Sequence, residues 1–148
     1  MRDFLEHPIV KGYIAANQFG ELLEKKFEIV RPGEVIYSME VKEKHLATPI
    51  AAHGGAIAAL MDATMGVCAL SQVIEQNKVV STIEMKISFL APAKLGDNLK
   101  GTAEIVKSGH RILFVEGLIE NQEGKKIAVA TGTFNAYPME KAGFKGEI

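Results

Sequence analysis

Two features of one short segment could support acyl-transfer chemistry: the glycine pair that follows His53, and the carboxylate of Asp62. Glycine lets a backbone approach a ligand closely, because no Cβ intervenes. If Gly54 and Gly55 begin a helix, their N–H groups lack intrahelical acceptors and lie at the positive end of the helix dipole. Such N–H groups can stabilise the oxyanion that forms in acyl transfer. Taken alone, the pair would rather indicate a helix packed tightly on a sheet.

Asp62 strengthens the catalytic interpretation. It is the only charged side chain between His53 and Glu75, and it stands among apolar residues such as Leu60 and Met65. Burying a bare carboxylate is costly, so Asp62 must be hydrogen-bonded, paired or functional. A carboxylate in this setting is suited to general-base catalysis. The alternative is a structural Asp62 whose partner comes from a neighbouring strand or subunit.

The spacing of the two features predicts an oligomer. Gly54 and Asp62 are eight residues apart, which separates them by about 12 Å along one α-helix. One thioester carbonyl cannot contact both from the same chain. We therefore expect a two-fold dimer with two equivalent sites at its interface, each taking Gly54 from one chain and Asp62 from the other.

The elements that would position these residues follow from the hydrophobic pattern. We expect an N-terminal helix over 9–23 and a central helix over about 54–76, apolar on nearly every face and therefore buried all round. The remaining apolar segments alternate and are joined by short turns, which favours antiparallel strands. These predicted strands are 26–30, 35–41, 79–90, 98–106, 111–120 and 125–137. The pattern predicts an α+β protein of the hotdog type, in which one antiparallel sheet of about six strands wraps around a central helix.

The composition predicts one domain over residues 1–148 and narrows the choice of partners. A formal net charge of -1 provides no field to attract nucleic acid or an anionic membrane. The lone Cys68 excludes an intrachain disulfide and fits a cytoplasmic location; it reads as a small buried hydrophobe. The N-terminus has no signal-peptide pattern, and the longest apolar stretch is interrupted by polar residues, so we expect no membrane span. We expect the tail after Pro138 to fray.

Neither a metal nor a separate cofactor is predicted. The four histidines show no metal-ligand spacing with carboxylates or with Cys68. No glycine-rich loop of the P-loop or dinucleotide type is present. Any coenzyme would therefore arrive as part of the substrate.

The chain resembles the PaaI-type hotdog thioesterases. The resemblance rests on His53-Gly54-Gly55, six further residues and then Asp62, on Gly66, and on the segment 87–96, and it extends from about Phe27 to Phe134. It implies acyl-CoA hydrolysis, with the Gly54 N–H on the thioester carbonyl and Asp62 of the opposing subunit as general base or nucleophile. Thr82 would orient the attacking water. His53 would shape the site without acting as the main base.

Two positions depart from the family pattern or complicate it. Family members often carry an asparagine six residues before the histidine, where this chain has Ala47; the adjacent Thr48 is a candidate substitute. Thr82 shares strand parity with Glu84 and Lys86, the more polar side of its strand. Its placement in the site therefore requires a twist or a β-bulge.

Substrate contacts are predicted from side-chain chemistry. We expect the acyl group to lie between the two central helices, against Leu60, Met61 and Met65, with the backbone of Gly55 close to the ligand. Exposed cations in turns are candidates for the phosphates of coenzyme A, although such residues are usually only solvated. These cations are Lys94, Lys107, His110 and Arg111.

The same residues are also compatible with two other functions. A hydratase or dehydratase of the same fold would pair a catalytic histidine with an acid across the dimer, which His53 and Asp62 could mimic. A stand-alone acyl-CoA binding module would use the same pocket without turnover.

Overall fold

The computed structural model describes residues 3–144 as a single antiparallel sheet with helices on one side. The α-helices are α1 (Pro8–Ala16), α2 (Gln18–Leu22) and α3 (Gly54–Val73), and the strands are β1 (Lys26–Arg31), β2 (Glu34–Glu40), β3 (Lys78–Phe89), β4 (Asn98–Ser108), β5 (Ile112–Glu120) and β6 (Lys126–Pro138). Short 3-10 helices are η1 (Phe4–Glu6), η2 (Glu43–His45), η3 (Ile74–Gln76) and η4 (Met139–Ala142).

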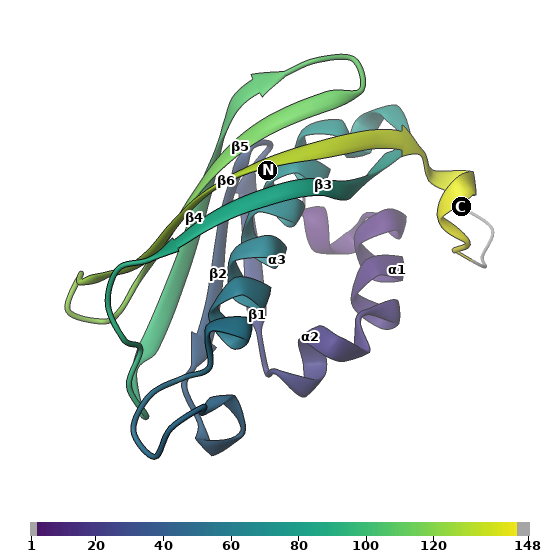
Figure 1. Cartoon of the computed structure of the whole chain (residues 1–148). Coiled ribbons are helices and arrows are strands. Elements are labelled where there is room, and N and C mark those ends of the chain that lie inside the picture. The colour runs from purple at the N-terminus through teal and green to yellow at the C-terminus, as the bar shows by residue number, and fades with distance from the viewer. Residues whose placement is uncertain (1–2, 145–148) are drawn as a thin grey trace.

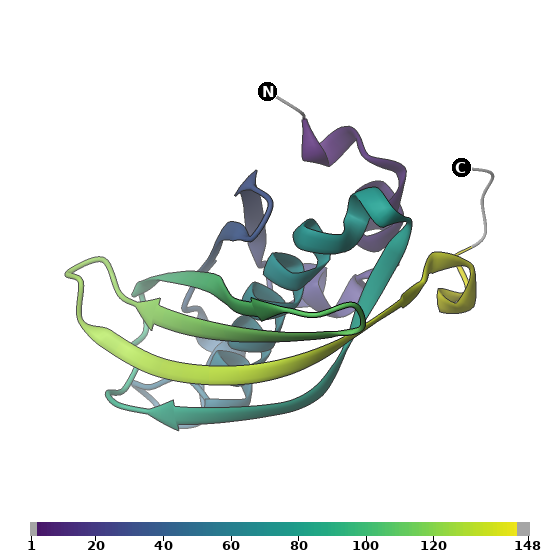
Figure 2. The ribbon, with the colours of Figure 1, turned by 90° about the horizontal axis from the view of Figure 1, so that it is seen from above.

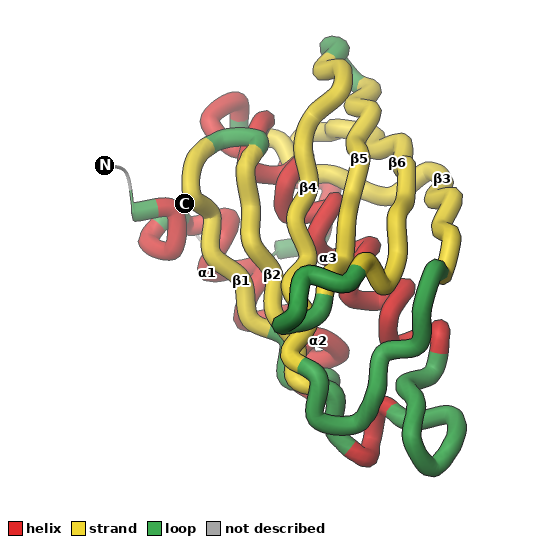
Figure 3. Tube along the Cα trace, turned by 90° about the vertical axis from the view of Figure 1, so that its left-hand side faces the viewer, coloured by secondary structure: helices red, strands yellow, loops and turns green. Residues whose placement is uncertain are grey.

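The six strands are ordered β1-β2-β4-β5-β6-β3, and every neighbouring pair is antiparallel. Figure 1 shows the sheet curving around α3, with α1 and α2 on the side of α3 that faces away from the sheet. The view from above confirms this order of layers (Figure 2), and the strands can be followed from β1 to β3 in Figure 3. The predicted α+β hotdog arrangement is confirmed.

Close approach of α3 to the sheet depends on small residues on the inner face. A Cβ added at Gly117 of β5 would lie 2.5 Å from Met61 Sδ, and one at Gly132 of β6 would lie 3.1 Å from Met65 Cε. Glycine therefore leaves the room that the methionine side chains of α3 occupy against the strands, and a larger residue would force these side chains to shift. Met61 and Met65 are 0% exposed as a result.

The central helix is a core element by its burial. The segment Gly54–Gln76 is long and apolar enough to cross a membrane by length and composition alone. However, 67% of its most apolar window is buried inside the fold. α3 is apolar on nearly every face because the sheet covers one side of it and the N-terminal helices cover the other.

Two terminal segments differ from expectation. The predicted single helix over 9–23 is divided at Asn17, whose backbone leaves the helical region (φ -85, ψ 64) and whose side chain accepts from Gly20 N–H at 3.0 Å. Asparagine readily caps a new helix, which explains the break. The tail after Pro138 does not simply fray: η4 follows, and Met139 N–H donates to the Asn77 carbonyl at 3.0 Å. Residues 145–148 of that tail lie outside the described residues.

Candidate active site

The first turn of α3 leaves one backbone donor available. His53 is the N-cap, and its Nδ1 accepts from Gly55 N–H at 2.8 Å while its carbonyl accepts from Ala56 N–H at 2.9 Å. Among the described residues, the N–H of Gly54 has no acceptor, and Gly54 is exposed. The donor that can serve a ligand is therefore Gly54, while the predicted ligand contact at Gly55 is restricted because its N–H is already used.

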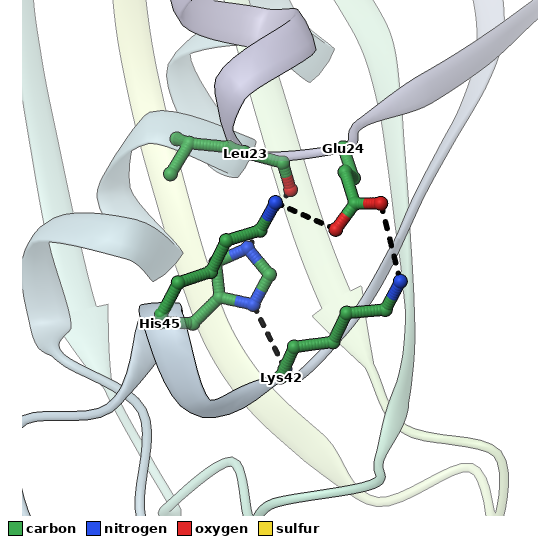
Figure 4. A network of polar contacts seen from close by, with 5 residues as sticks. Leu23, Glu24, Lys42 and His45 are labelled. Atoms are coloured by element: carbon green, nitrogen blue, oxygen red, sulfur yellow. Dashed lines mark hydrogen bonds and ion pairs between the residues drawn. The ribbon is translucent and has the colours of Figure 1, made fainter.

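A buried histidine holds the loop that leads into this turn (Figure 4). His45 is 1% exposed; its Nδ1 accepts from Lys42 N–H at 2.9 Å, which leaves Nε2 to donate to the Leu23 carbonyl at 2.8 Å. The His45 carbonyl accepts from His53 N–H at 2.7 Å. His45 thus joins the end of α2, the segment after β2 and the N-cap of α3. The sequence offered no periodic signal for this role, because its partners are distant in the chain.

A surface ion-pair cluster lies over the same loop. Glu24 contacts Lys44 Nζ at 2.6 Å and Lys42 Nζ at 3.2 Å, and Figure 4 marks the contact between Glu24 and Lys42 by a dashed line. The pKa of Glu24 is lowered, first by the hydrogen bond to Lys44 and then by that to Lys42. Exposed pairs of this kind add little stability, so His45 is the main anchor of the loop.

The third turn of α3 carries Asp62, and its partner comes from the edge strand. Thr82 Oγ1 donates to Asp62 Oδ1 at 2.7 Å, and Asp62 is half-buried. In the pairing of β3 with β6, Thr82 lies opposite Phe134 and Glu84 lies opposite Thr133, so Ile83 is an extra residue in β3. This β-bulge changes the parity of the strand and lets Thr82 point towards α3. The β-bulge that Thr82 needs to reach the site is therefore present.

Two further side chains surround Asp62, and sequence reasoning missed both. Lys25 Nζ donates to the Ala59 carbonyl at 3.2 Å and lies 5.7 Å from the centre of the Tyr37 ring. Burial lowers the pKa of Lys25, and the charge of Asp62 opposes that shift. Burial also raises the pKa of Tyr13. Asp62 therefore has an ammonium group and a neutral phenol in its electrostatic surroundings, brought in by segments far from it in sequence.

Gly54 and Asp62 remain apart within one chain. Both belong to α3, which is continuous from Gly54 to Val73, so eight residues of helical rise separate them by about 12 Å. The single chain therefore supplies two half-sites, an amide donor and a carboxylate.

Several predicted substrate contacts are placed elsewhere. Leu60, Met61 and Met65 are all 0% exposed, Met61 and Met65 lie against Gly117 of β5, and none of the three lines the cavity beside Asp62. Their predicted role as the acyl lining between two central helices stays a prediction, since the cavity beside Asp62 is lined by other residues of the single chain. Thr48 is exposed, and its Oγ1 accepts from Ala51 N–H at 3.1 Å, so it stabilises the loop before α3.

The predicted phosphate-binding cations fall into two groups. Lys94 is exposed near the start of α3, where it forms an isolated bridge with Ala51. His110 and Arg111 are exposed in the turn between β4 and β5, and the His110 carbonyl accepts from Lys78 Nζ at the start of β3, the other end of that strand. The cations at the two ends of β3 therefore do not form one site within a chain. Among residues 3–144, no group of three or more His, Cys, Asp or Glu is suited to a metal ion.

Comparison with known proteins places this geometry in context. Residues 51–128 match the family model of the thioesterase superfamily. Human acyl-coenzyme A thioesterase 13 is 31% identical over 122 residues, which cover 81% of this chain and 86% of the human protein. The PaaI protein of the phenylacetic acid degradation operon of E. coli has the same fold (TM-score 0.79, 22% identity, 86% of this chain and 89% of that chain). A hypothetical thioesterase of Streptococcus pneumoniae, solved with coenzyme A, matches with a TM-score of 0.70 and 28% identity over 77% of this chain and 89% of that one.

Proposed function

The chain belongs to the thioesterase superfamily and is an acyl-CoA thioesterase, and we propose that each active site pairs Gly54 of one protomer with Asp62 of a second. The observation that carries this proposal is the continuity of α3, which keeps the free Gly54 N–H and the Asp62–Thr82 pair about two turns apart in one chain. Two chains related by a two-fold axis would complete two equivalent sites.

The edge strand β3 supplies the surface for such a dimer. β3 ends the sheet, so its outer edge carries backbone N–H and C=O groups that pair with no other strand of the described chain. Large apolar side chains are exposed on and just after it: Ile83 at 55%, Phe89 at 54% and Leu90 at 54%. An exposed apolar edge favours pairing with a second copy.

The register of this pairing follows from the way β3 lies on α3. The strand runs antiparallel to the helix, because a Cβ at Gly54 would lie 3.5 Å from the Phe89 ring while Thr82 bonds Asp62. A two-fold axis perpendicular to the sheet, midway between Thr82 and Phe89, would bring Gly54 of the partner subunit level with Asp62. We therefore expect antiparallel β3–β3 pairing centred near Met85 and Lys86.

In this site the chemistry is a hydrolysis with two defined roles. The Gly54 N–H binds the thioester oxygen and stabilises the oxyanion that forms on attack. Asp62 accepts a proton from the attacking water, the C–S bond breaks, and the proton passes to the departing thiolate. Alternatively, the carboxylate attacks the carbonyl and water then hydrolyses the resulting anhydride.

Thr82 has a more specific role than the one first expected. Its hydroxyl proton is donated to Asp62 Oδ1, which orients the carboxylate, and Oδ2 would then act on the substrate. The hydroxyl oxygen can still accept a hydrogen bond from water. A hydratase would require His53 as the acid–base group, but His53 Nδ1 is already bound to Gly55 N–H. That commitment favours hydrolysis over hydration.

Complementation between two inactive variants tests the shared site. Gly54→Pro replaces the N–H by a ring carbon and should keep the backbone: proline is favoured at the first helical position, and His53 already has the extended conformation (φ -64, ψ 136) that a following proline requires. Asp62→Asn removes the base. Each homodimer should be inactive by free-thiol release, whereas an equal mixture after subunit exchange should recover about a quarter of the wild-type sites.

Gly54→Ala is the matched control for Gly54→Pro. Gly54→Ala keeps the N–H, and its Cβ would meet the Phe89 ring at an ordinary 3.5 Å, so this variant should stay active. If the mixture remains inactive although heterodimers form, the two groups do not act across the interface. Hydrolysis retained by Asp62→Asn alone would remove Asp62 from the mechanism.

A further inference from the structure

A cavity of about 170 Å³ lies beside the Asp62–Thr82 pair, between α1, α3 and β3. The two polar residues stand on its wall, and most of the remaining lining is apolar. Val79 and Leu70, each 5% exposed, line it on the side of β3 and α3, and Phe134 of β6 contributes from the sheet. An apolar cavity with a few polar groups on one side is the usual form of a small-molecule site.

We propose that this cavity holds the acyl tail, and that it selects compact acyl groups over long linear chains. The inference rests on the proposed function, since the cavity is continuous with Asp62 and Thr82. An apolar cavity of about 150 Å³ accommodates benzene. By that measure the space suits a tail of about six carbons, branched, cyclic or linear.

Part of the cavity wall comes from outside the matched family segment. Ile9 and Tyr13 of α1 line the cavity, as does Phe144 after η4, whereas the family model covers residues 51–128. Ile9 is 2% exposed, and a Cβ added at Gly12 would lie 3.2 Å from the Phe144 ring, so α1 and the segment after η4 pack directly together. These two terminal segments therefore contribute to the length limit of the substrate.

Tyr13 is held in place as part of this wall. Its hydroxyl accepts from Asn17 Nδ2 at 3.0 Å, and its ring packs 6.0 Å from that of Phe27. These contacts fix the ring between the cavity and the start of the sheet. A fixed aromatic wall limits chain length more strictly than a mobile side chain does.

Gly66 offers a way to shrink the cavity without disturbing the fold. It lines the cavity from α3, and a Cβ added there would meet only Phe134 Cε1, at 3.6 Å. Alanine is also a better helix former than glycine. Gly66→Ala therefore fills the cavity, whereas Ile9→Ala enlarges it; Ile112→Ala, at an exposed position of β5, is the control for loss of apolar surface.

The test is a chain-length profile of kcat/KM, measured by thiol release from acetyl-, butanoyl-, hexanoyl-, benzoyl-, decanoyl- and palmitoyl-CoA. For the wild type we expect the highest value at hexanoyl- or benzoyl-CoA and at least a roughly tenfold lower value at palmitoyl-CoA. Gly66→Ala should lower hexanoyl-CoA turnover about tenfold and leave acetyl-CoA within about twofold. Ile9→Ala should move the optimum towards decanoyl-CoA, and Ile112→Ala should reproduce the wild-type profile.

The outcomes separate this inference from the proposed function. If no acyl-CoA is hydrolysed, the proposed function fails. If hydrolysis occurs but Gly66→Ala leaves the profile unchanged, or palmitoyl-CoA is turned over as fast as hexanoyl-CoA, the cavity does not hold the tail and the function stands. Should Ile9→Ala unfold, Gly66→Ala decides the question alone.

Discussion

The first and third turns of α3 carry the two groups that the proposed mechanism uses, and they present these groups by different means. The first turn offers a main-chain donor, Gly54 N–H, in an exposed position that His53 and His45 hold from the preceding loop. The third turn offers the half-buried carboxylate of Asp62, which Thr82 orients from β3. A main-chain donor survives most substitutions of its own residue, whereas a carboxylate is lost by a change of one atom. The two turns should therefore respond very differently to mutation.

The sharpest test of this difference compares Asp62→Asn with Gly54→Ala. If Asp62 acts as proposed, its loss should lower kcat by about 10³-fold, within the range for acid–base catalysis, while Gly54→Ala keeps its N–H and should stay within about threefold of wild type. Steady-state thiol release measures both, and unchanged thermal unfolding confirms that each variant is folded. Equal losses in the two variants would contradict the division of roles.

His45→Leu tests whether the first turn depends on its buried anchor. The substitution leaves the partly buried Lys42 N–H and Leu23 carbonyl without their partner, and an unpaired group costs up to about 1–3 kcal/mol when it is shielded from water. We expect the free energy of unfolding to fall by about 3 kcal/mol, with a lower kcat/KM because the loop before Gly54 loosens. Urea unfolding measures the first effect. Lys44→Ala, which removes only a surface ion pair, should change stability little.

Thr82→Val tests the support of the third turn. It removes the hydrogen bond to Asp62 but keeps the shape of the side chain. A hydrogen bond to a charged group contributes about 1.5–3 kcal/mol, so kcat should fall at least about tenfold. Thr82→Ser keeps the hydroxyl and should retain most of the activity; a serine variant as impaired as the valine variant would show that packing matters instead.

His53→Ala should have a smaller effect, confined to the first turn. Loss of the N-cap releases Gly55 N–H and costs about 1 kcal/mol of stability. Because the Gly54 N–H remains, kcat should fall only a few-fold, whereas loss of the main base would be far more severe. His53→Asn can still cap the helix and should restore stability in a thermal unfolding measurement.

Substitution of Cys68 is expected to have the smallest effect on activity, although Cys68 lies on the same helix. It is 0% exposed, its Sγ contacts the Gly33 carbonyl at 3.2 Å, and burial raises its pKa to about 12. The reactive species is the thiolate, and a raised pKa means that it forms only in strongly alkaline solution. A thiol reagent at pH 8 should label the unfolded protein and not the native one, and Cys68→Ala should keep full activity. Rapid native labelling would contradict this burial.

The sequence by itself determined the main elements and predicted which residues form the two half-sites. Hydrophobic period is a local property, so the buried helix from Gly54 and the antiparallel strands were readable without a structure. Asp62 could be recognised as a candidate because a charge in an apolar helix must be paired, hydrogen-bonded or functional. Helical rise alone separated Gly54 from Asp62 and predicted the dimer, which stays a prediction until complementation tests it.

The tertiary structure decided which groups meet. Only the folded chain shows that His53 occupies the Gly55 N–H, that a bulge at Ile83 aims Thr82 at Asp62, and that His45 holds the loop before α3. It also placed Met61 and Met65 in the core and built a separate cavity from α1 and α3. These contacts join residues that are far apart in sequence or depend on strand register, and local periodicity carries no information about either.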